Sequence, residues 1–259
     1  MMEPFEVQRR LVIAAPPSTV FRYFTDSARF AAWWGPGSTI EPREGGPVRI
    51  CYPGGEVASG VVLELVPDRR LRFSYGYENP SKPIRPGGSV VLIELSPVAG
   101  GTELTLQHLV DSEAIRDAHV PGWRYQLAVF AHVVAKEQHA EATARVDRYF
   151  SAWAEPDPAT RATILAEATS DDVSFRDPYG ATLGRAELVD HIGAARLHLG
   201  ALVLSRQGPV RQGDDLGVVS WVARDASGKA AAQGENLLCF APDGKIRRIV
   251  GVWAAQGTS

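Results

Sequence analysis

The feature that most constrains the fold is a long stretch without helix-breaking residues in the middle of the chain. No glycine or proline occurs between Trp123 and Glu155, although the whole sequence contains 25 glycines and 18 prolines. Within this stretch, Leu127, Phe130 and Val134 continue the spacing of three and four that begins at Trp123, which predicts a helix with one buried face. Helical structure therefore lies between two halves of the chain that are both rich in strands and turns.

The length of the chain favours two domains. A chain of 259 residues is long for one compact core and suits two of about 100–150 residues each. A second buried helical stripe starts at Val146, directly after a polar patch at 136–139. We therefore predict a boundary near His139, with domains at 1–139 and 140–259 joined by helix and not by a flexible linker.

The first half is predicted to be a helix-grip domain, in which a long helix lies across a curved antiparallel sheet and a cavity opens between them. Short apolar segments between 48 and 109 are separated by Pro and Gly turns, as in a meander. The long helix is predicted to begin at Pro121-Gly122. Aromatic side chains of this half are candidates to line the cavity, although most of them are expected to be plain core because aromatic residues dominate core burial: Trp33, Trp34, Phe73, Tyr75 and Trp123.

The second half repeats the order of helices followed by strands. Helices are predicted at 146–153, 160–168 and 187–199, and strands at 173–177 and in four segments after residue 201. The fold class is therefore α+β, with the helices covering a strongly curved sheet that forms a cone. The candidate ligand-binding residues here are aromatic: Phe150, Trp153, Phe175 and Phe240.

The strongest candidate for chemistry is the set Tyr149, Asp177 and Asn236. The strand period of two places Asp177 on the same face as Val173 and Phe175, and an apolar setting raises the pKa of a carboxylate towards that of a useful general base. Tyr149 lies on the buried stripe of its helix. The competing interpretation is structural, because Asp-Pro commonly opens a turn in which the carboxylate binds backbone N–H groups.

Composition excludes several classes of protein. The net charge of −3 is spread evenly over the two halves, so neither half has the basic surface that nucleic acid requires. No apolar run is long enough to span a membrane, and the acidic N-terminus is unlike a signal peptide.

With Cys51 and Cys239 in different halves, free thiols in the cytoplasm are expected. His191 and His198 lie too far apart on their helix for one metal ion, and neither a metal nor a cofactor is predicted.

The first half resembles the activator-of-Hsp90-ATPase homologue family, within the group of START-like helix-grip domains, over roughly residues 5–138. The resemblance is carried by Phe30-Ala31-Ala32-Trp33-Trp34-Gly35-Pro36, by Val62-Leu63-Glu64-Leu65-Val66-Pro67 with Leu71 and Phe73, by Gly101-Thr102-Glu103-Leu104-Thr105-Leu106 with His108, and by Gly122-Trp123. It implies a fold that encloses a ligand cavity.

The second half resembles SnoaL-like domains of the nuclear-transport-factor-2 superfamily over roughly residues 140–254. The matching segments are Arg148-Tyr149-Phe150, Asp171–Pro178 and Gly184-Arg185. Because this superfamily includes ketosteroid isomerase and polyketide cyclases, the resemblance implies that Asp177 shuttles a proton and that Tyr149 donates to an enolate. Asn236 falls where ketosteroid isomerase has a protonated aspartic acid, which is a departure from that pattern.

Three functions follow from these observations. The first is a binder of small apolar metabolites, such as polyketides, steroids or other aromatic compounds. The second is an isomerase or cyclase that acts on a ketone, with Asp177 as general base and Tyr149 as oxyanion donor; the sequence leaves open whether the protein is an enzyme. The third, a chaperone-associated factor, rests on the name of the first family alone. The expected partner is a small hydrophobic molecule, and a homodimer is left open.

Overall fold

The computed structural model describes residues 5–253, which form a mixed α+β fold. The chain divides into two compact units, Met1–Ala135 and Lys136–Ser259. Among the described residues, no helix is both long enough and apolar enough to cross a membrane.

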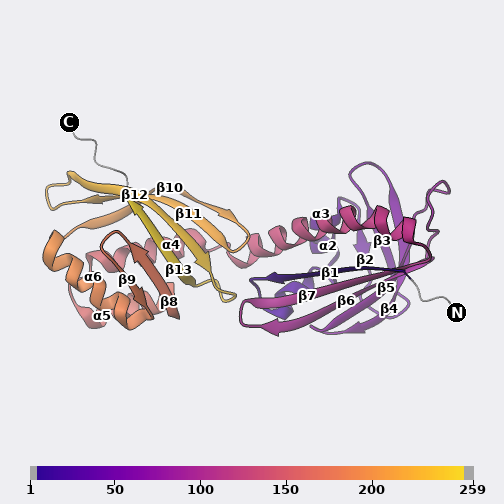
Figure 1. The fold of residues 1–259 in the computed structure, drawn as a ribbon, viewed down its shortest axis with the longest axis horizontal. Helices are drawn as coiled ribbons and strands as arrows, with labels where there is room; N and C mark the ends of the chain where they lie inside the picture. The colour runs from indigo at the N-terminus through magenta and orange to yellow at the C-terminus, as the bar shows by residue number, and fades with distance from the viewer. Residues whose placement is uncertain (1–4, 254–259) are drawn as a thin grey trace. The chain divides into compact units, whose positions relative to one another are not determined.

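The N-terminal unit is built on one antiparallel sheet of seven strands in the order β1-β7-β6-β5-β4-β3-β2. Its elements, coloured indigo to magenta in Figure 1, are β1 (Phe5–Ile13), α1 (Pro17–Arg22), α2 (Ser27–Trp34), β2 (Thr39–Ile40), β3 (Pro47–Cys51), β4 (Val57–Val66), β5 (Arg70–Tyr75), β6 (Ser89–Val98), β7 (Gly101–Val110) and α3 (Glu113–Gln138). The predicted meander is present, with β1 added at its edge beside β7.

The core of this unit lies between the sheet and its helices. Leu127, Phe130 and Val134 on α3 are at most 4% exposed and belong to the same buried cluster as Leu71 and Leu104 of the sheet. The helical spacing of three and four therefore correctly identified the face of α3 that is buried.

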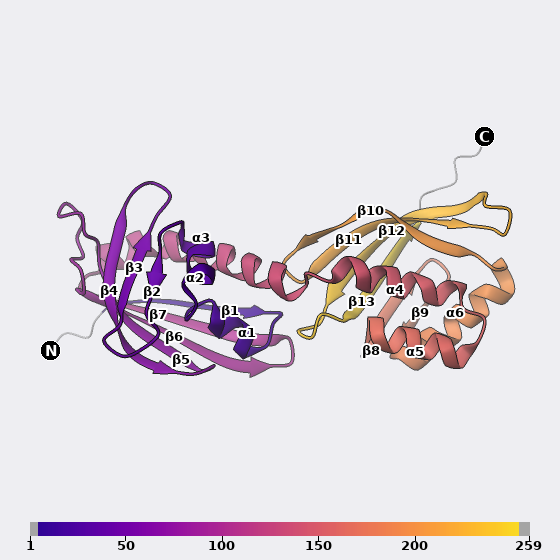
Figure 2. The same cartoon turned by 180° about the vertical axis from the view of Figure 1, so that it is seen from behind.

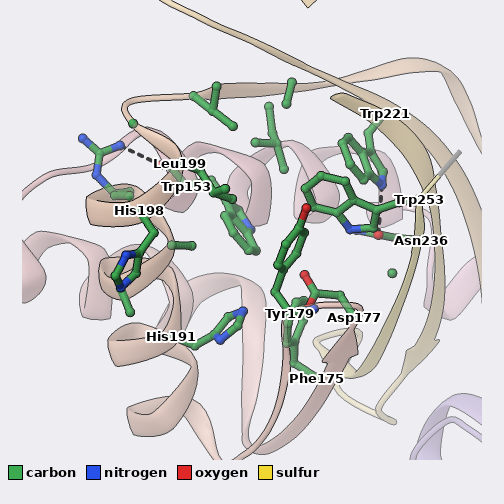
Figure 3. Close-up of a pocket in the computed structure, with 18 of the residues that line it drawn as sticks. Trp153, Phe175, Asp177, Tyr179, His191, His198, Leu199, Trp221, Asn236 and Trp253 are labelled. Carbon is green, nitrogen blue, oxygen red and sulfur yellow. Dashed lines mark hydrogen bonds between the residues drawn. The ribbon is translucent and has the colours of Figure 1, made fainter. Parts of the chain in front are cut away.

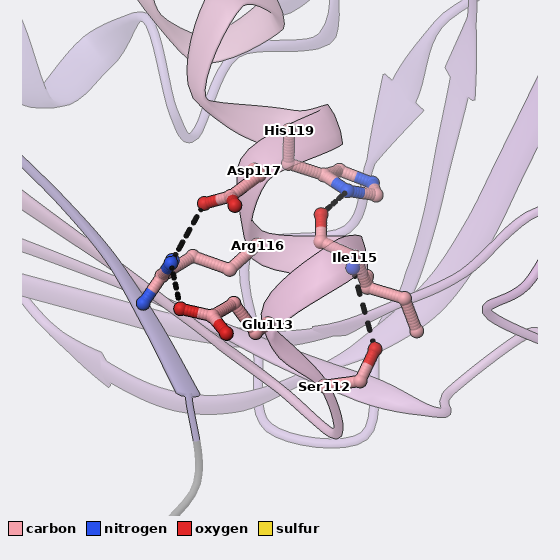
Figure 4. Close-up of polar contacts among 6 residues, drawn as sticks. All are labelled: Ser112, Glu113, Ile115, Arg116, Asp117 and His119. Atoms are coloured by element: carbon pink, nitrogen blue, oxygen red, sulfur yellow. Dashed lines mark hydrogen bonds and ion pairs between the residues drawn. The ribbon is translucent and has the colours of Figure 1, made fainter.

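The predicted start of the long helix at Pro121 is wrong. Helix α3 begins at Glu113 and contains Pro121 in its interior. Figure 4 shows the reason: the Ser112 hydroxyl accepts a hydrogen bond from the backbone N–H of Ile115 (3.3 Å), and Arg116 pairs with Glu113 (2.8 Å). A serine cap and an acidic residue in the first turn stabilise a helix start, which the proline further along does not prevent.

His108 on β7 has no exposed surface and is held by two hydrogen bonds. The Trp123 indole N–H, which can only donate, lies 3.0 Å from His108 Nδ1. The Nδ1 atom must therefore be an acceptor, so the proton of the neutral ring is on Nε2, 2.9 Å from the Ser89 hydroxyl. Burial, and to a smaller extent the neighbouring His119, lowers the pKa of His108 to about 3.

This buried imidazole is expected to make the N-terminal unit sensitive to acid. The folded state takes up the proton of His108 only near pH 3, whereas an unfolded chain takes it up near about pH 6.5. The contribution of His108 to the free energy of unfolding is therefore fully present above about pH 6.5. It decreases as the pH falls from about 6.5 towards the pKa of the folded state, by at most about 1.4 kcal/mol per pH unit for one group. Amide hydrogen exchange of β6 and β7 at pH 7 and pH 4.5 measures the loss. The same comparison on His108→Leu should give a smaller loss, and an equal loss would contradict this account.

The C-terminal unit places three helices against one sheet. The elements after α3 are α4 (Ala142–Ala154), α5 (Pro158–Ala168), β8 (Thr169–Asp177), β9 (Gly180–Leu183), α6 (Arg185–Leu199), β10 (Val203–Gly213), β11 (Leu216–Arg224), β12 (Ala230–Phe240) and β13 (Ile246–Trp253). The sheet order is β10-β11-β12-β13-β8-β9. Only the β13–β8 pair among these strands is parallel, and Figure 2 shows α4, α5 and α6 gathered on the same side of the sheet.

A short turn separates α3 from α4. Helix α3 ends at Gln138 and α4 begins at Ala142, whose backbone N–H donates to the His139 carbonyl (3.0 Å). His139 is buried and its ring stacks on Phe240 (5.3 Å between centroids). The helical segment is therefore interrupted by one tight turn, although it contains no glycine or proline.

Candidate functional site

A cavity of about 330 Å³ lies in the C-terminal unit, between the helices and the inner face of the sheet. Its walls are mainly aromatic and aliphatic. The side chains labelled in Figure 3 come from α4, α6 and the strands β8, β11, β12 and β13, with Tyr179 from the turn after β8. The lining residues are Tyr149, Trp153, Phe175, Asp177, Tyr179, His191, Ala194, Ala195, Arg196, His198, Leu199, Gly200, Leu202, Leu204, Trp221, Ala223, Asn236, Gly251 and Trp253. All three residues of the candidate catalytic set are among them.

Asp177 anchors a turn and also lines the cavity, so its position is compatible with both interpretations that the sequence left open. Its Oδ1 accepts hydrogen bonds from the backbone N–H groups of Tyr179 (2.8 Å) and Gly180 (3.0 Å), which is the arrangement of a turn. The side chain is nevertheless half-buried and lines the cavity. Burial raises the pKa of Asp177 above its ordinary value, and the Tyr179 N–H and the nearby His191 offset part of this effect. One oxygen thus anchors the turn, and the carboxylate is still available to a ligand.

Tyr149 provides a hydroxyl that remains protonated at neutral pH. The residue is 1% exposed and belongs to the hydrophobic core of the unit. Burial raises the pKa of Tyr149 well above its usual value; the neighbouring Trp153 indole partly opposes the shift, and Asp177 adds to it. A phenol in this state is a hydrogen-bond donor, which suits it to stabilise negative charge on an oxygen atom.

Asn236 is oriented by a tryptophan. The Trp221 indole N–H donates to Asn236 Oδ1 (3.1 Å), and both side chains are at most 5% exposed. An indole can only donate, so the amide oxygen must face Trp221 and the NH₂ group is left to donate to another partner. Asn236 is therefore a fixed donor in the cavity wall.

Gly251 brings Asp177 and Asn236 together. It pairs with Asn236 on β12, and β13 in turn pairs with β8, the strand that ends at Asp177. A Cβ atom at Gly251 would lie 3.1 Å from Asp177 Cβ and 3.3 Å from Asn236 Oδ1. The missing side chain on β13 leaves room for the two polar side chains on the strands that flank it, β8 and β12.

His191 is the functional candidate that sequence reasoning set aside. Its ring lines the cavity and packs on Phe175 (5.0 Å between centroids) and Trp153 (6.2 Å). A signal was present in the sequence, because His191 lies three residues after the fully buried Leu188 on α6 and so faces the same side. Tyr179, Trp221 and Trp253 were also missed, since nothing local marks them as neighbours of Asp177.

The arrangement can bind a flat ligand and can act on a carbonyl group. Donors from Tyr149 and Asn236 can hold an oxygen atom, while Asp177 can accept a proton from an adjacent carbon. Among residues 5–253, no three His, Cys, Asp or Glu side chains lie close enough together to hold a metal ion.

Comparison with known proteins assigns the N-terminal unit. The family model described as "Activator of Hsp90 ATPase homolog 1-like protein" matches residues 14–135. These residues form an Activator of Hsp90 ATPase homolog 1-like domain. No curated protein matches the chain.

Solved structures resemble about half of the chain. An AHSA1-like protein from Rhizobium etli is 37% identical, with 52% of this chain and 84% of that chain covered and a TM-score of 0.43. A protein of the SnoaL-like family from Agrobacterium tumefaciens is 22% identical, with 46% and 99% covered and a TM-score of 0.42. The Aha1 dimer from Colwellia psychrerythraea is 17% identical, with 50% and 96% covered and a TM-score of 0.44.

In the Activator of Hsp90 ATPase homolog 1-like domain, the five candidate aromatic residues lie in the core. Trp33, Trp34, Phe73, Tyr75 and Trp123 are each at most 5% exposed. Trp34 packs against Trp33 (4.3 Å between centroids) and Trp123 (5.6 Å), and the Tyr75 hydroxyl is 2.7 Å from that of Tyr52. All five side chains belong to the single buried cluster that forms the core of this domain.

The four aromatic candidates of the C-terminal unit separate into two groups. Trp153 and Phe175 line the cavity. Phe150 is buried and lines a separate groove beside β10, and Phe240 is fully buried against His139. The structure therefore brings two of the four together with Asp177.

Proposed function

We propose that the C-terminal unit binds a small, mostly apolar ligand that carries a carbonyl group. The observation that supports this most strongly is the cavity itself, which has a volume of about 330 Å³, aromatic walls and a few polar groups that converge on it. Small-molecule sites are usually concave and apolar, with a small number of placed polar groups.

Several finer assignments belong to the same proposal. The order of helices before a curved sheet, with Tyr149, Asp177 and Asn236 in one cavity, favours a SnoaL-like domain in the second half of the chain. The proposed domains are residues 1–139 and 140–259. Both cysteines are free thiols, in keeping with the reducing cytoplasm.

A proton-transfer activity is the second candidate, and a specific observation favours it. A half-buried carboxylate with a raised pKa lies in the same cavity as a protonated tyrosine. Asp177 would remove a proton from the carbon next to the carbonyl, and Tyr149 and Asn236 would hold the oxygen as its negative charge develops. The reaction class is isomerisation or cyclisation of a ketone.

Thermal unfolding against a panel of steroids, polyketides and aromatic ketones tests the binding proposal. A ligand present at 100 times its dissociation constant should stabilise the protein by about 2.7 kcal/mol. Ala195 on α6 is half-buried and lines the cavity, so Ala195→Phe should abolish the stabilisation by filling the space. An unchanged response in that variant would place the ligand elsewhere, and no response to any compound in the wild type would reject the proposal.

A further inference from the structure

Two buried nitrogen atoms in the cavity wall have no hydrogen-bond partner among the described residues: Trp153 Nε1 and His191 Nε2. The Trp153 indole N–H is directed at the Tyr149 oxygen closely enough to lower the pKa of that phenol as a hydrogen-bond donor does. The pair does not, however, reach the distance and angle of an ordinary hydrogen bond, so Trp153 Nε1 is left without a partner. A buried donor without a partner is costly, and such groups in native proteins commonly have a functional reason.

The two side chains form one wall of the cavity and are held in place. Their rings meet edge to face, with centroids 6.2 Å apart. The His191 ring also lies directly over Gly180, where a Cβ atom would come within 3.0 Å of the imidazole Cε1. Packing on both sides fixes the direction of the ring nitrogens, and Figure 3 shows His191 projecting from α6 towards the side where Phe175 and Asp177 lie.

The same wall carries positive charge. Arg196, five residues after His191 on α6, lines the cavity and donates from Nη1 to the Trp153 carbonyl (2.7 Å). Asp177 is the one acidic side chain that lines this cavity, and two backbone N–H groups already bind its Oδ1. An anionic group of a ligand would therefore meet the Trp153 indole N–H, a guanidinium group, and the His191 imidazole, which donates from Nε2 in the tautomer that carries its proton there.

We propose that Trp153 Nε1 and His191 Nε2 bind a carboxylate of the ligand, with Arg196 adding positive potential, so that the ligand class is an aromatic keto acid. This inference rests on the proposed function and deepens it. The ketone lies towards Tyr149, Asp177 and Asn236, and the acid lies towards Trp153 and His191. Charge-assisted hydrogen bonds to two fixed donors give the carboxylate an advantage over a neutral ester of the same shape.

Three matched probes test the proposal by calorimetric titration of the full chain at pH 7.5: 6-acetyl-2-naphthoic acid, its methyl ester and 2-acetylnaphthalene. We expect the acid to bind the wild type at least about tenfold more tightly than the ester. His191→Phe and Trp153→Phe should each reduce this preference to less than about threefold, and retained binding of 2-acetylnaphthalene shows that the cavity is intact.

His132→Phe is the matched control, because His132 is an exposed histidine on α3 that does not line this cavity. The preference for the acid should persist in this variant, and an equal loss there would mean that the preference does not depend on His191. Equal binding of acid and ester by the wild type would overturn the carboxylate subsite and leave the binding proposal standing. Failure of all three probes to bind the wild type would overturn the binding proposal, and the subsite with it.

Discussion

Replacing Phe130 with alanine is expected to destabilise the N-terminal unit by about 3–5 kcal/mol, the usual cost of removing a buried phenylalanine ring. Phe130 has no exposed surface, and its ring contacts those of Phe24 (4.7 Å between centroids), Trp33 (4.9 Å) and Tyr23 (6.0 Å). These three neighbours lie on the segment between β1 and β2 and are themselves at most 3% exposed, so their packing limits how far they can move into the space left by the ring.

Urea unfolding followed by amide hydrogen exchange measures this loss separately in each unit. The control is Tyr125→Ala on the same helix, since Tyr125 is 71% exposed and should change stability by less than about 0.5 kcal/mol. The C-terminal unit should keep its stability in both variants. A loss below about 1 kcal/mol for Phe130→Ala would mean that the aromatic cluster repacks around the site.

The second large effect concerns proton transfer. If Asp177 is the general base, Asp177→Asn should slow exchange of the α-protons of bound 6-acetyl-2-naphthoic acid with D₂O by about 10²–10⁴-fold. An amide has the shape of the carboxylate but cannot accept the proton. NMR of the acetyl methyl group measures the rate directly, and the dissociation constant should change little.

The pH dependence follows from the raised pKa of Asp177. Only the ionised carboxylate accepts a proton, so exchange should be slow at acidic pH and rise through a pKa above the ordinary carboxyl value. Asp172→Asn is the control, because Asp172 is exposed on the same strand. Unchanged exchange in Asp177→Asn would remove the enzyme hypothesis and leave Asp177 as the residue that anchors its turn.

The sequence predicted most of the fold because its signals are local. The stripe at Trp123, Leu127, Phe130 and Val134 needs only helical spacing, and the alternation before Asp177 needs only the strand period. The start of α3 was missed because Pro121 outweighed a weaker signal, the serine at 112 followed by an acidic residue.

The candidate site was only partly predictable, because it depends on how distant segments pair. Asp177, Asn236 and Gly251 become neighbours only when β8, β13 and β12 adopt their observed order. Nothing near Trp221 in the sequence indicates that its N–H binds Asn236. From the sequence, His191 was tested only as a metal ligand together with His198, and that role was rejected. The spacing of three residues from Leu188, which places His191 on the buried side of α6, was not used.

The contact between Trp221 and Asn236 has a consequence for how this cavity can evolve. Because the indole N–H requires only an oxygen at the end of the side chain, aspartic acid at position 236 can accept the same hydrogen bond as asparagine. The codons for the two residues differ by a single base. One base change would therefore place a second carboxylic acid in the cavity, in addition to Asp177. Trp221 already lies where its indole N–H would orient the new side chain.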